Sequence, residues 1–319
     1  MNYTNTSSIF ENILVTGGAG FIGSQLIKKL LPLCRHIYII DDLSTGQKNA
    51  VPVSEKITFH HDCITNKKLL FEIMPKVKHI FHLACSNLLQ SVRDLEKDFQ
   101  TNLFGGFVML QCAKSHCPDL KRFVYTSTAS IYSDASILPT PETYYKISLP
   151  YAASKFSSEH YCDVYNHMYQ LPTTVLRLSN VYGPGQTTSN PYCGVVAKFF
   201  EAAQKKQPLM VYMDGQQTRD FTYIEDALDA LLLSAVKEKA IGQIYNVGMG
   251  VETNIIELAE KIKYITGFTK GTIEFRPKRQ IDIVARRNID AKKIQKELNW
   301  KPQYNLHEGL LKTFQWMKG

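Results

Sequence analysis

A phenol and an ammonium group stand four residues apart in the segment "YAASK", Tyr151 to Lys155. On a helix this spacing places both side chains on one face. A free tyrosine has a pKa of about 10, which is too high for a base at neutral pH. A neighbouring ammonium stabilises the phenolate and lowers that pKa. The pair therefore predicts a proton-transferring tyrosine whose pKa is controlled by the lysine.

A hydroxyl group that can assist this tyrosine lies upstream, in "YTSTAS". Thr128 directly follows an apolar run that predicts a strand. From there its side chain can hydrogen-bond a substrate oxygen and help to hand over its proton. The alternative is that the hydroxyls of this cluster only bond backbone groups where the strand ends. We adopt this structural interpretation for Ser127 and Ser130, and the catalytic one for Thr128.

The segment "NILVTGGAGFIGSQLIKKL" combines a predicted strand, three spaced glycines and a predicted helix. Gly17 allows a tight turn, Gly20 lets the backbone approach a pyrophosphate, and Gly23 lets the helix pack close to the sheet. The helix N-terminus then presents amide donors and a partial positive charge to phosphates. The strand–helix context predicts a dinucleotide site formed by Gly17, Gly20, Phe21, Ile22 and Gly23.

Two acidic residues extend the predicted dinucleotide site. Asp41 ends the next apolar run roughly 20 residues beyond the last glycine, where a carboxylate accepts hydrogen bonds from the hydroxyls of an adenosine ribose. The same charge repels a 2′-phosphate, so the sequence favours NAD over NADP. Asp62 is placed to meet an adenine edge or, alternatively, belongs to a helix N-cap region. We interpret Asp42 as a turn residue. The positive ring of bound NAD would lower the pKa of Tyr151 further.

The elements that must position these residues alternate along the chain. Strand–helix alternation of this kind predicts right-handed crossovers and a doubly wound parallel sheet, the Rossmann type of α/β fold. Ligands of such folds bind at the carboxyl ends of the strands, where the residues above lie. Buried strands are predicted at 12–17, 36–41, 57–62, 79–84, 122–127, 173–178 and 243–248, with helix-length segments such as 23–34, 95–117 and 151–170 between them.

The pattern changes after about residue 181. "YGPGQTTSNPYCG" is a Gly/Pro/Asn-rich loop, followed by a predicted helix near 195–205 and a short strand at "LMVYM". The run at 243–248 then returns to the first sheet. The sequence therefore predicts a Rossmann domain and a smaller, interleaved C-terminal substrate domain. The expected bounds are 12–180 plus about 220–250 for the first, and 181–219 plus 251–319 for the second.

Composition limits the classes of function. The Lys and Arg residues that give the net charge of +8 are spread along the chain instead of forming one stripe, so we expect no nucleic-acid partner. No apolar run reaches the roughly 18 residues of a membrane helix, and the polar N-terminus has no signal-peptide features. The seven cysteines include no Cys-x-x-Cys pair, which suits reduced thiols in the cytoplasm. Cys112, His116 and Cys117 have helical spacing but no fourth ligand, so we expect no metal site.

Taken together, these motifs resemble the extended short-chain dehydrogenase/reductase family of nucleotide-sugar enzymes. The resemblance runs from residue 13 to at least residue 300. It implies tightly bound NAD, with Thr128 as catalytic hydroxyl, Tyr151 as base and Lys155 as cofactor-binding lysine. It also implies a nucleoside-diphosphate sugar in the smaller domain, and a homodimer formed by the helices that begin near residues 95 and 151. The motifs that carry it are "TGGAGFIG", "DDLSTG", "HLA", "STASIY", "YAASK", "RLSNVYGPGQ" and "GQQTRDFTYIEDA".

The resemblance also implies a set of substrate contacts. Asn180 matches the family's asparagine on the diphosphate side of the substrate. Arg219 and Arg279 match arginines that bind its phosphates, because a guanidinium fork suits phosphate oxygens. Asp282 matches the carboxylate that accepts from a uridine ribose. Arg286 falls close to the residue that limits the sugar's 2-substituent in 4-epimerases, and an arginine there could meet a carboxylate on the sugar.

The residues after Thr128 distinguish reactions within this family. The 4,6-dehydratases carry an Asp-Glu pair there and the UDP-glucuronate decarboxylases a nearby Glu, whereas this sequence has Ala129 and Ser130. The resemblance therefore implies the UDP-glucose 4-epimerase branch, acting on a UDP-hexose. Ser133, where the family usually has Gly, and the "CSNLLQS" loop indicate a modified sugar. The alternatives are a 4,6-dehydratase, a 4-keto reductase, and a non-catalytic NAD-binding regulator on the same fold.

Overall fold

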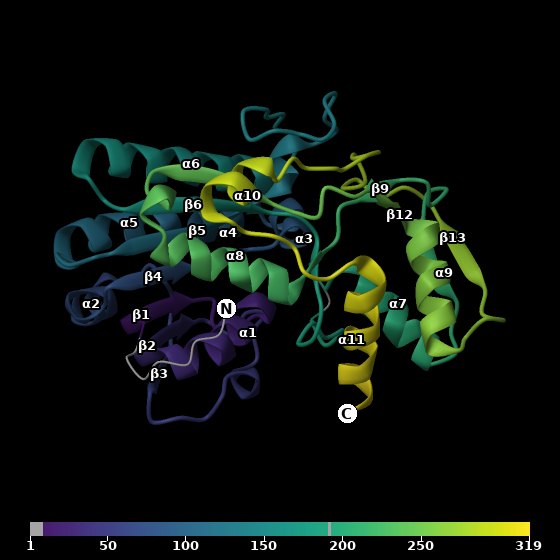
Figure 1. Ribbon diagram of the computed structural model, residues 1–319, viewed down its shortest axis with the longest axis horizontal. Helices are drawn as coiled ribbons and strands as arrows, with labels where there is room; N and C mark the ends of the chain where they lie inside the picture. The colour runs from purple at the N-terminus through teal and green to yellow at the C-terminus, as the bar shows by residue number, and fades with distance from the viewer. Residues whose placement is uncertain (1–8, 191–192) are drawn as a thin grey trace.

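A parallel sheet with helices on both faces forms the larger part of the molecule (Figure 1). The computed structural model describes residues 9–190 and 193–319. Strand order places β1 between β4 and β2, which confirms the predicted doubly wound Rossmann sheet. In their side-by-side order the seven strands are β11 (Gln243–Val247), β6 (Thr173–Leu178), β5 (Arg122–Thr128), β4 (His79–His82), β1 (Phe10–Thr16), β2 (Cys34–Asp41) and β3 (Ile57–His61).

Residues of β1 alternate between two hydrophobic cores. Ile13 and Val15 pack on the face covered by α1 (Phe21–Leu30) and α8 (Ile224–Val236), whereas Leu14 packs on the opposite face. Because both faces are buried, such strands are apolar throughout, and this is why the sequence located them. The helices on the opposite face are α2 (Lys67–Ile73), α5 (Gly105–His116) and α6 (Pro150–Tyr169).

The helix predicted over 95–117 is interrupted. It divides into α4 (Leu95–Asp98), a π-helical turn (Phe99–Phe104) and α5. Within the wide turn, the amide of Asn102 pairs with the backbone of Ser86, accepting from its N–H at 2.8 Å and donating to its carbonyl at 2.9 Å. The π-turn thereby holds the loop that connects β4 to α3 (Leu88–Arg93), and π-turns of this kind are frequent at functional sites.

Short strands and helices form a second region, on the right of Figure 1. The last two helices do not stay together there, since α10 packs against β11 of the large sheet. The predicted domain bounds stay a prediction, but residues 251–319 serve both regions. The strand pairs are β8 (Leu209–Tyr212) with β13 (Ile273–Arg276), β9 (Thr218–Arg219) with β12 (Thr253–Asn254), and β7 (Val181–Tyr182) with β10 (Thr222–Tyr223). The helices of this region are α7 (Val195–Gln204), α9 (Ile255–Thr266) and α11 (Leu306–Lys318), whereas α10 (Lys292–Leu298) lies against the large sheet.

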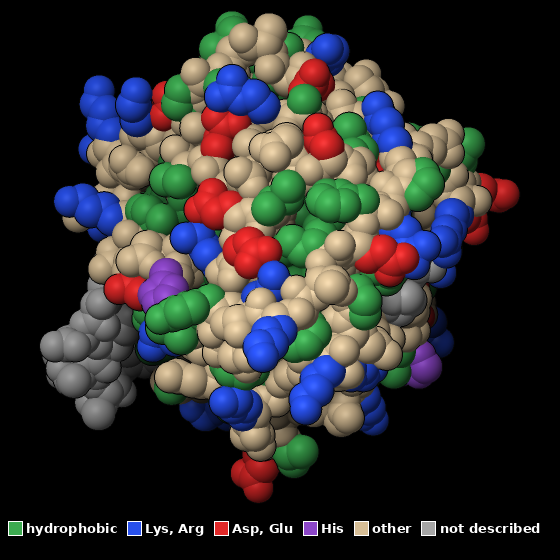
Figure 2. Space-filling view, turned by 90° about the vertical axis from the view of Figure 1, so that its right-hand side faces the viewer, with side chains coloured by type: hydrophobic (Ala, Val, Ile, Leu, Met, Phe, Trp, Pro, Cys, Tyr) green, Lys and Arg blue, Asp and Glu red, His purple; other side chains and the backbone are tan. Residues whose placement is uncertain are grey.

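Charged side chains of both signs are intermixed on the face shown in Figure 2, which favours solvated surface charge there. No helix in the described part of the chain has the length and apolar character that crossing a membrane requires. All seven cysteines are free thiols.

A buried ion pair joins α6 to the sheet. The guanidinium of Arg177, on β6, donates to both carboxylate oxygens of Glu159, on α6, at 2.7 to 3.1 Å. The side chains are only 3% and 2% exposed. Arg177 also donates to the Tyr132 hydroxyl at 3.0 Å and to the Glu142 carbonyl at 2.7 Å. Every part of this buried guanidinium fork is therefore bonded.

Removing the carboxylate of this pair should destabilise the protein strongly. Glu159→Gln keeps the side-chain volume but leaves the Arg177 charge buried without a counter-charge, so we expect a loss of about 3–5 kcal/mol. The matched control is Glu201→Gln, which breaks the exposed pair of Glu201 with Lys205 and should cost about 0–1 kcal/mol. Urea-unfolding midpoints measure both. Equal shifts for the two variants would show that the buried pair has no special weight.

Candidate active site

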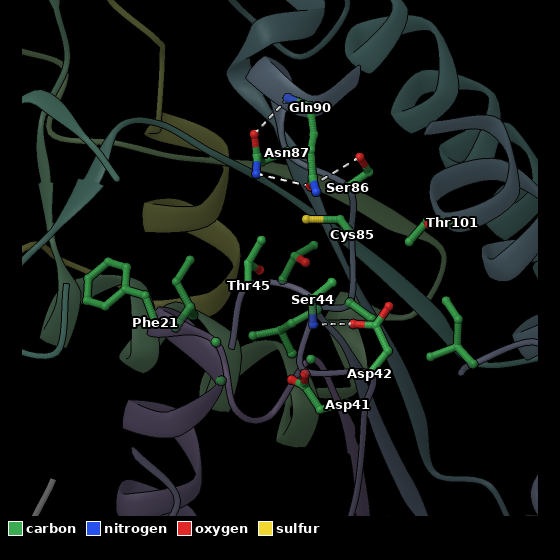
Figure 3. A pocket seen from close by; sticks show the side chains of 18 of the residues that line it. Phe21, Asp41, Asp42, Ser44, Thr45, Cys85, Ser86, Asn87, Gln90 and Thr101 are labelled. Atoms are coloured by element: carbon green, nitrogen blue, oxygen red, sulfur yellow. Dashed lines mark hydrogen bonds between the residues drawn. The ribbon is translucent and has the colours of Figure 1, made fainter. Parts of the chain in front are cut away.

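A cavity of about 360 Å³ opens at the carboxyl ends of the central strands, which is within the usual size range of small-molecule sites. Figure 3 shows Asp41, Asp42 and Ser44 on one side of it, and Ser86 and Asn87 on the other. Every residue predicted for catalysis or for cofactor binding lines this cavity: Gly17, Gly20, Phe21, Ile22, Gly23, Asp41, Asp62, Thr128, Tyr151 and Lys155.

The glycine turn is too crowded for side chains. Gly17 has a φ of +69°, and a Cβ there would lie 2.6 Å from the backbone nitrogen of Ala84. A Cβ on Gly23 would overlap the carbonyl of Gly17. In this turn, the end of β1, the start of α1 and the loop after β4 are therefore close enough for their backbones to be in contact. This leaves amide groups of the α1 N-terminus facing the cavity, an arrangement that suits a pyrophosphate.

Asp41 is fixed at the edge of this turn. Its carboxylate accepts from the backbone N–H of Ala19 at 2.8 Å and from that of Leu43 at 2.9 Å. Burial raises the pKa of Asp41, while these two hydrogen bonds lower it. Each carboxylate oxygen keeps a second lone pair, so the group can still accept from two ribose hydroxyls. The residues present fit the adenosine end of a dinucleotide.

The other two acidic residues of the cavity have local roles as well. Asp42 accepts from the backbone N–H of Ser44 at 2.9 Å, as a turn residue does. Asp62 accepts from the amide group of Asn66 at 2.8 Å. Asn66, not Asp62, is the N-cap of α2. Asp62 therefore supports the cap while lining the cavity, and both of its predicted roles are compatible with the structure.

Tyr151 and Lys155 occupy the first turns of α6, on the side that faces the cavity. Lys155 is 2% exposed, and its ammonium nitrogen lies 4.4 Å from the centre of the Tyr125 ring. Burial lowers the pKa of Lys155. Burial raises the pKa of Tyr151 well above its ordinary value; the neighbouring Cys85 raises it further, and a hydrogen bond with Thr128 lowers it. Phenol, ammonium and hydroxyl thus share one end of the cavity.

The hydroxyl groups at the end of β5 differ in their hydrogen bonding, and not as the sequence predicted. Thr128 accepts from the backbone N–H of Ser130 at 3.0 Å, which caps a short 3₁₀-helix, Ala129–Tyr132, and it also bonds Tyr151. Thr128 therefore has the structural role, and its contact with Tyr151 is compatible with the catalytic role, which stays a prediction. The structural interpretation of Ser127 is wrong, because its buried hydroxyl has no hydrogen-bond partner among the described residues. Ser127 lines the cavity, so a ligand can reach that side of β5.

Cys85 is a cavity residue that the sequence reasoning missed. Its sulfur projects into the cavity from the loop after β4 (Figure 3), and it is in hydrogen-bonding contact with Tyr151. The Asn102–Ser86 pairing fixes the residue next to it. The signal that could have found it is its place just past a buried strand, at the same sheet edge as Thr128.

Apart from Thr128, the residues predicted to bind the substrate lie outside the lining of this cavity. Asn180 is exposed between β6 and β7. Arg279 closes its fork on Asp282, with bonds of 2.9 and 2.7 Å, and stacks 3.9 Å from the centre of the Tyr212 ring. Among the described residues, Arg219 donates to backbone alone, to the carbonyls of residues 218 and 284. The structure thus brings the two arginines and Asp282 into one charged cluster.

Two further side chains that drew attention in the sequence have other partners. Arg286 pairs with Glu252 and is largely exposed. His116 stacks on Phe71, and the Cys117 thiol donates to the Val77 carbonyl. Over residues 9–190 and 193–319, no group of three His, Cys, Asp or Glu side chains is arranged to hold a metal ion.

Several known proteins are similar to this chain in both sequence and fold. The model of the NAD dependent epimerase/dehydratase family matches residues 13–248. A UDP-glucose 4-epimerase of Mycolicibacterium smegmatis is 34% identical over 314 residues, covering 96% of this chain and 98% of that one. A dTDP-glucose 4,6-dehydratase of Haemophilus influenzae is 30% identical, covering 96% and 97%. The crystal structure of a UDP-glucose 4-epimerase with UDP-glucose from Thermotoga maritima superposes with a TM-score of 0.89 at 33% identity, covering 96% and 98%.

The matched region contains the glycine turn, Asp41 and the Tyr151–Lys155 pair, in the geometry described above. The likeness extends over nearly the full length of both relatives. This chain therefore belongs to the NAD-dependent epimerase/dehydratase family of nucleotide-sugar enzymes, and NAD is its cofactor.

Proposed function

We propose that this enzyme is a nucleotide-sugar 4-epimerase, which inverts C4 of a UDP-hexose or of a modified UDP-hexose through a 4-keto sugar. The observation that carries the proposal is the composition of the catalytic end of the cavity. It offers the phenol of Tyr151, the hydroxyl of Thr128 and the ammonium of Lys155. These groups suit reversible removal and return of one hydroxyl proton.

The distribution of acids favours epimerisation over elimination. Among the described residues that line the cavity, the carboxylates are those of Asp41, Asp42 and Asp62, all at the ends of β2 and β3. Ala129 and Ser130 follow Thr128. Loss of water from C5 and C6 needs one group to remove the C5 proton and another to protonate the leaving oxygen. Two further ionisable side chains act on Tyr151: the Cys85 thiol and the buried carboxylate of Asp98. Asp98 is held by Ser91, Asn102 and Ser154 and does not line the cavity, whereas Cys85 does, so the thiol keeps a dehydratase with a displaced acid as the second candidate.

Three side chains of the chain share the proton chemistry. Tyr151 takes the proton of the C4 hydroxyl, and Thr128 holds the same oxygen or relays its proton. NAD, which the glycine turn, Asp41 and Lys155 would hold, would supply the hydride acceptor and donor for C4 of the sugar. Lys155 lines the same cavity, where its ammonium would stabilise the phenolate form of Tyr151. The hydrogen bond with Thr128 opposes the rise in the pKa of Tyr151 that burial causes. Tyr151 finally gives its proton back to the C4 oxygen.

A homodimer is the second part of the proposal. Apolar side chains lie exposed along α4, the π-turn and α6, for example Leu95 at 61%, Phe99 at 51% and Met168 at 64%. Tyr165, on the same helix, is buried within the monomer. Apolar side chains gathered on neighbouring helices are typical of an interface. The face fits a second copy of the chain through these residues: Leu95, Phe99, Phe104, Tyr161, Val164 and Met168.

Replacing the proposed base should remove turnover and leave the cofactor in place. Tyr151→Phe deletes the phenolic oxygen, so we expect the rate to fall by about 10²- to 10⁴-fold with unchanged NAD content. Tyr264→Phe, a change at a 75% exposed tyrosine on α9, is the control. NMR of the products from UDP-hexoses should show an isomer of equal mass. Loss of water, or consumption of added NADH, would favour the dehydratase or the reductase.

The charge of Asp41 should set the choice of dinucleotide. Asp41→Asn keeps an oxygen acceptor but removes the charge that repels a 2′-phosphate, so NAD binding weakens and the preference for NAD over NADP shrinks by about tenfold or more. Asp42→Asn, one residue further on, is the matched control. Fluorescence titration of the stripped protein with each dinucleotide measures the ratio. An unchanged ratio in Asp41→Asn would mean that another group selects the cofactor.

A charge on the exposed helix face should separate the dimer. Val164 is 41% exposed, so Val164→Glu leaves the fold intact but buries a carboxylate between two copies. Light scattering at micromolar concentration should report a dimer for the natural chain and a monomer for the variant. Tyr264→Glu, at a 75% exposed position on α9, should remain dimeric. A natural chain that is monomeric at this concentration contradicts the proposed dimer.

A further inference from the structure

A buried guanidinium outside the described cavity lacks a full set of partners. Arg287 lies between β13 and α10 and is 7% exposed. One terminal nitrogen donates to the carbonyl of Ser133 at 3.2 Å. Its Nε is buried and has no hydrogen-bond partner among the described residues. Arg177, the other deeply buried arginine fork considered above, has every such group bonded.

Arg287 and Arg219 come from two segments that run side by side. The backbone N–H of Thr218 donates to the carbonyl of Ala285 at 2.9 Å, and that of Arg287 donates to the Thr218 hydroxyl at 3.2 Å. Arg219 donates in turn to the carbonyl of Val284 at 3.1 Å. Burial, together with the nearby charge of Arg219, lowers the pKa of Arg287 to about 9. Two cations are therefore held close enough to repel each other.

The acids around this pair are bonded elsewhere. Asp282 is paired with Arg279. The carboxylate of Asp220 accepts three backbone N–H groups, those of residues 249, 250 and 289, and Asp134 accepts the N–H of Ala285. Within the described residues, neither Arg219 nor Arg287 has a carboxylate in hydrogen-bonding contact. Uncompensated charge in a buried place is costly unless a ligand completes it.

We propose that Arg219 and Arg287 together bind an oxyanion of the nucleotide sugar, with Arg287 supplying a donor fork that the sequence did not predict. The inference rests on the proposed function, because it assigns part of the same substrate. The oxyanion is a phosphate oxygen or a carboxylate on the sugar, and both accept from a guanidinium fork. Ser133 directly follows the 3₁₀-helix that Thr128 caps, so Arg287 reaches the catalytic loop from the second region.

The proposal revises two expectations about neighbouring arginines. Arg279, expected on the phosphates, has its fork closed on Asp282. Arg286, expected near the sugar, is exposed and paired with Glu252. Arg287, one residue further on, is the buried member of the "ARRN" segment and the one with an unbonded donor. The positive charge that serves the substrate therefore lies at residue 287 of this segment.

The test compares Arg287→Gln and Arg287→Lys with the natural chain and with Arg276→Gln, a control at an exposed pair. The purified, NAD-loaded proteins are titrated calorimetrically with UDP, UDP-glucose, UDP-glucuronate and inorganic pyrophosphate, and their melting temperatures are recorded. We expect Arg287→Gln to melt at or above the temperature of the natural chain, because a repelling buried charge is gone. We expect it to bind UDP about 10- to 100-fold more weakly. Arg287→Lys keeps the charge without the fork, and it should also bind weakly and fold normally.

The ligands separate the outcomes. If the residue-287 variants bind all three uridine nucleotides more weakly, the Arg287 guanidinium contacts the diphosphate. If they bind only UDP-glucuronate more weakly, the guanidinium contacts a carboxylate on the sugar. Natural affinity of both variants for every ligand overturns the inference and leaves the proposed function standing. A natural chain that binds pyrophosphate through Arg287 but no uridine nucleotide would instead overturn the substrate assignment. A natural chain that binds none of the four ligands overturns both.

Discussion

The catalytic end of this enzyme depends on the buried ion pair between Glu159 and Arg177. Glu159 lies on α6, two turns beyond the helix start that carries Tyr151 and Lys155, and Arg177 lies on β6 beside β5. The guanidinium also bonds Tyr132, at the end of the 3₁₀-helix that follows Thr128. The Arg177 guanidinium thus connects two parts of the site. One is α6, which carries Tyr151 and Lys155, and the other is the loop that follows Thr128. Such a pair fixes geometry because breaking either half leaves a buried charge alone.

A second set of polar contacts fixes the opposite wall. Asp98 accepts from the hydroxyls of Ser91 and Ser154 and from the amide of Asn102, and Asn102 pairs with the Ser86 backbone. Since Ser154 belongs to α6, the π-turn, the loop after β4 and the catalytic helix share one buried carboxylate. Cys85 and Tyr151 therefore meet at a position that both networks determine. A site held this way needs little reorganisation when a substrate binds.

The sequence could predict those parts of the site that local chemistry dictates. A Gly17 turn at positive φ, a carboxylate at Asp41 and the spacing of Tyr151 and Lys155 each leave a pattern in the residue order, and all line one cavity. The buried strands were predictable because both sheet faces are covered. The roles of Ser127 and Cys85 were not predictable from the sequence. Tertiary packing alone determines whether a hydroxyl is hydrogen-bonded to the backbone and whether a thiol lies next to a tyrosine. The break in the helix over 95–117 has the same origin, since the Asn102–Ser86 pairing is long-range.

Buried charges in this chain fall into two groups, and the difference between them is informative about function. Arg177 is balanced by Glu159, Asp220 by three backbone amides, and both serve the fold. Arg287 is buried and Arg219 half-buried, and neither is hydrogen-bonded to a carboxylate of the described residues. Both lie in a region built from segments that pair only through short stretches of backbone. The substrate oxyanion proposed above would supply the hydrogen-bonded counter-charge that Arg219 and Arg287 lack among the described residues.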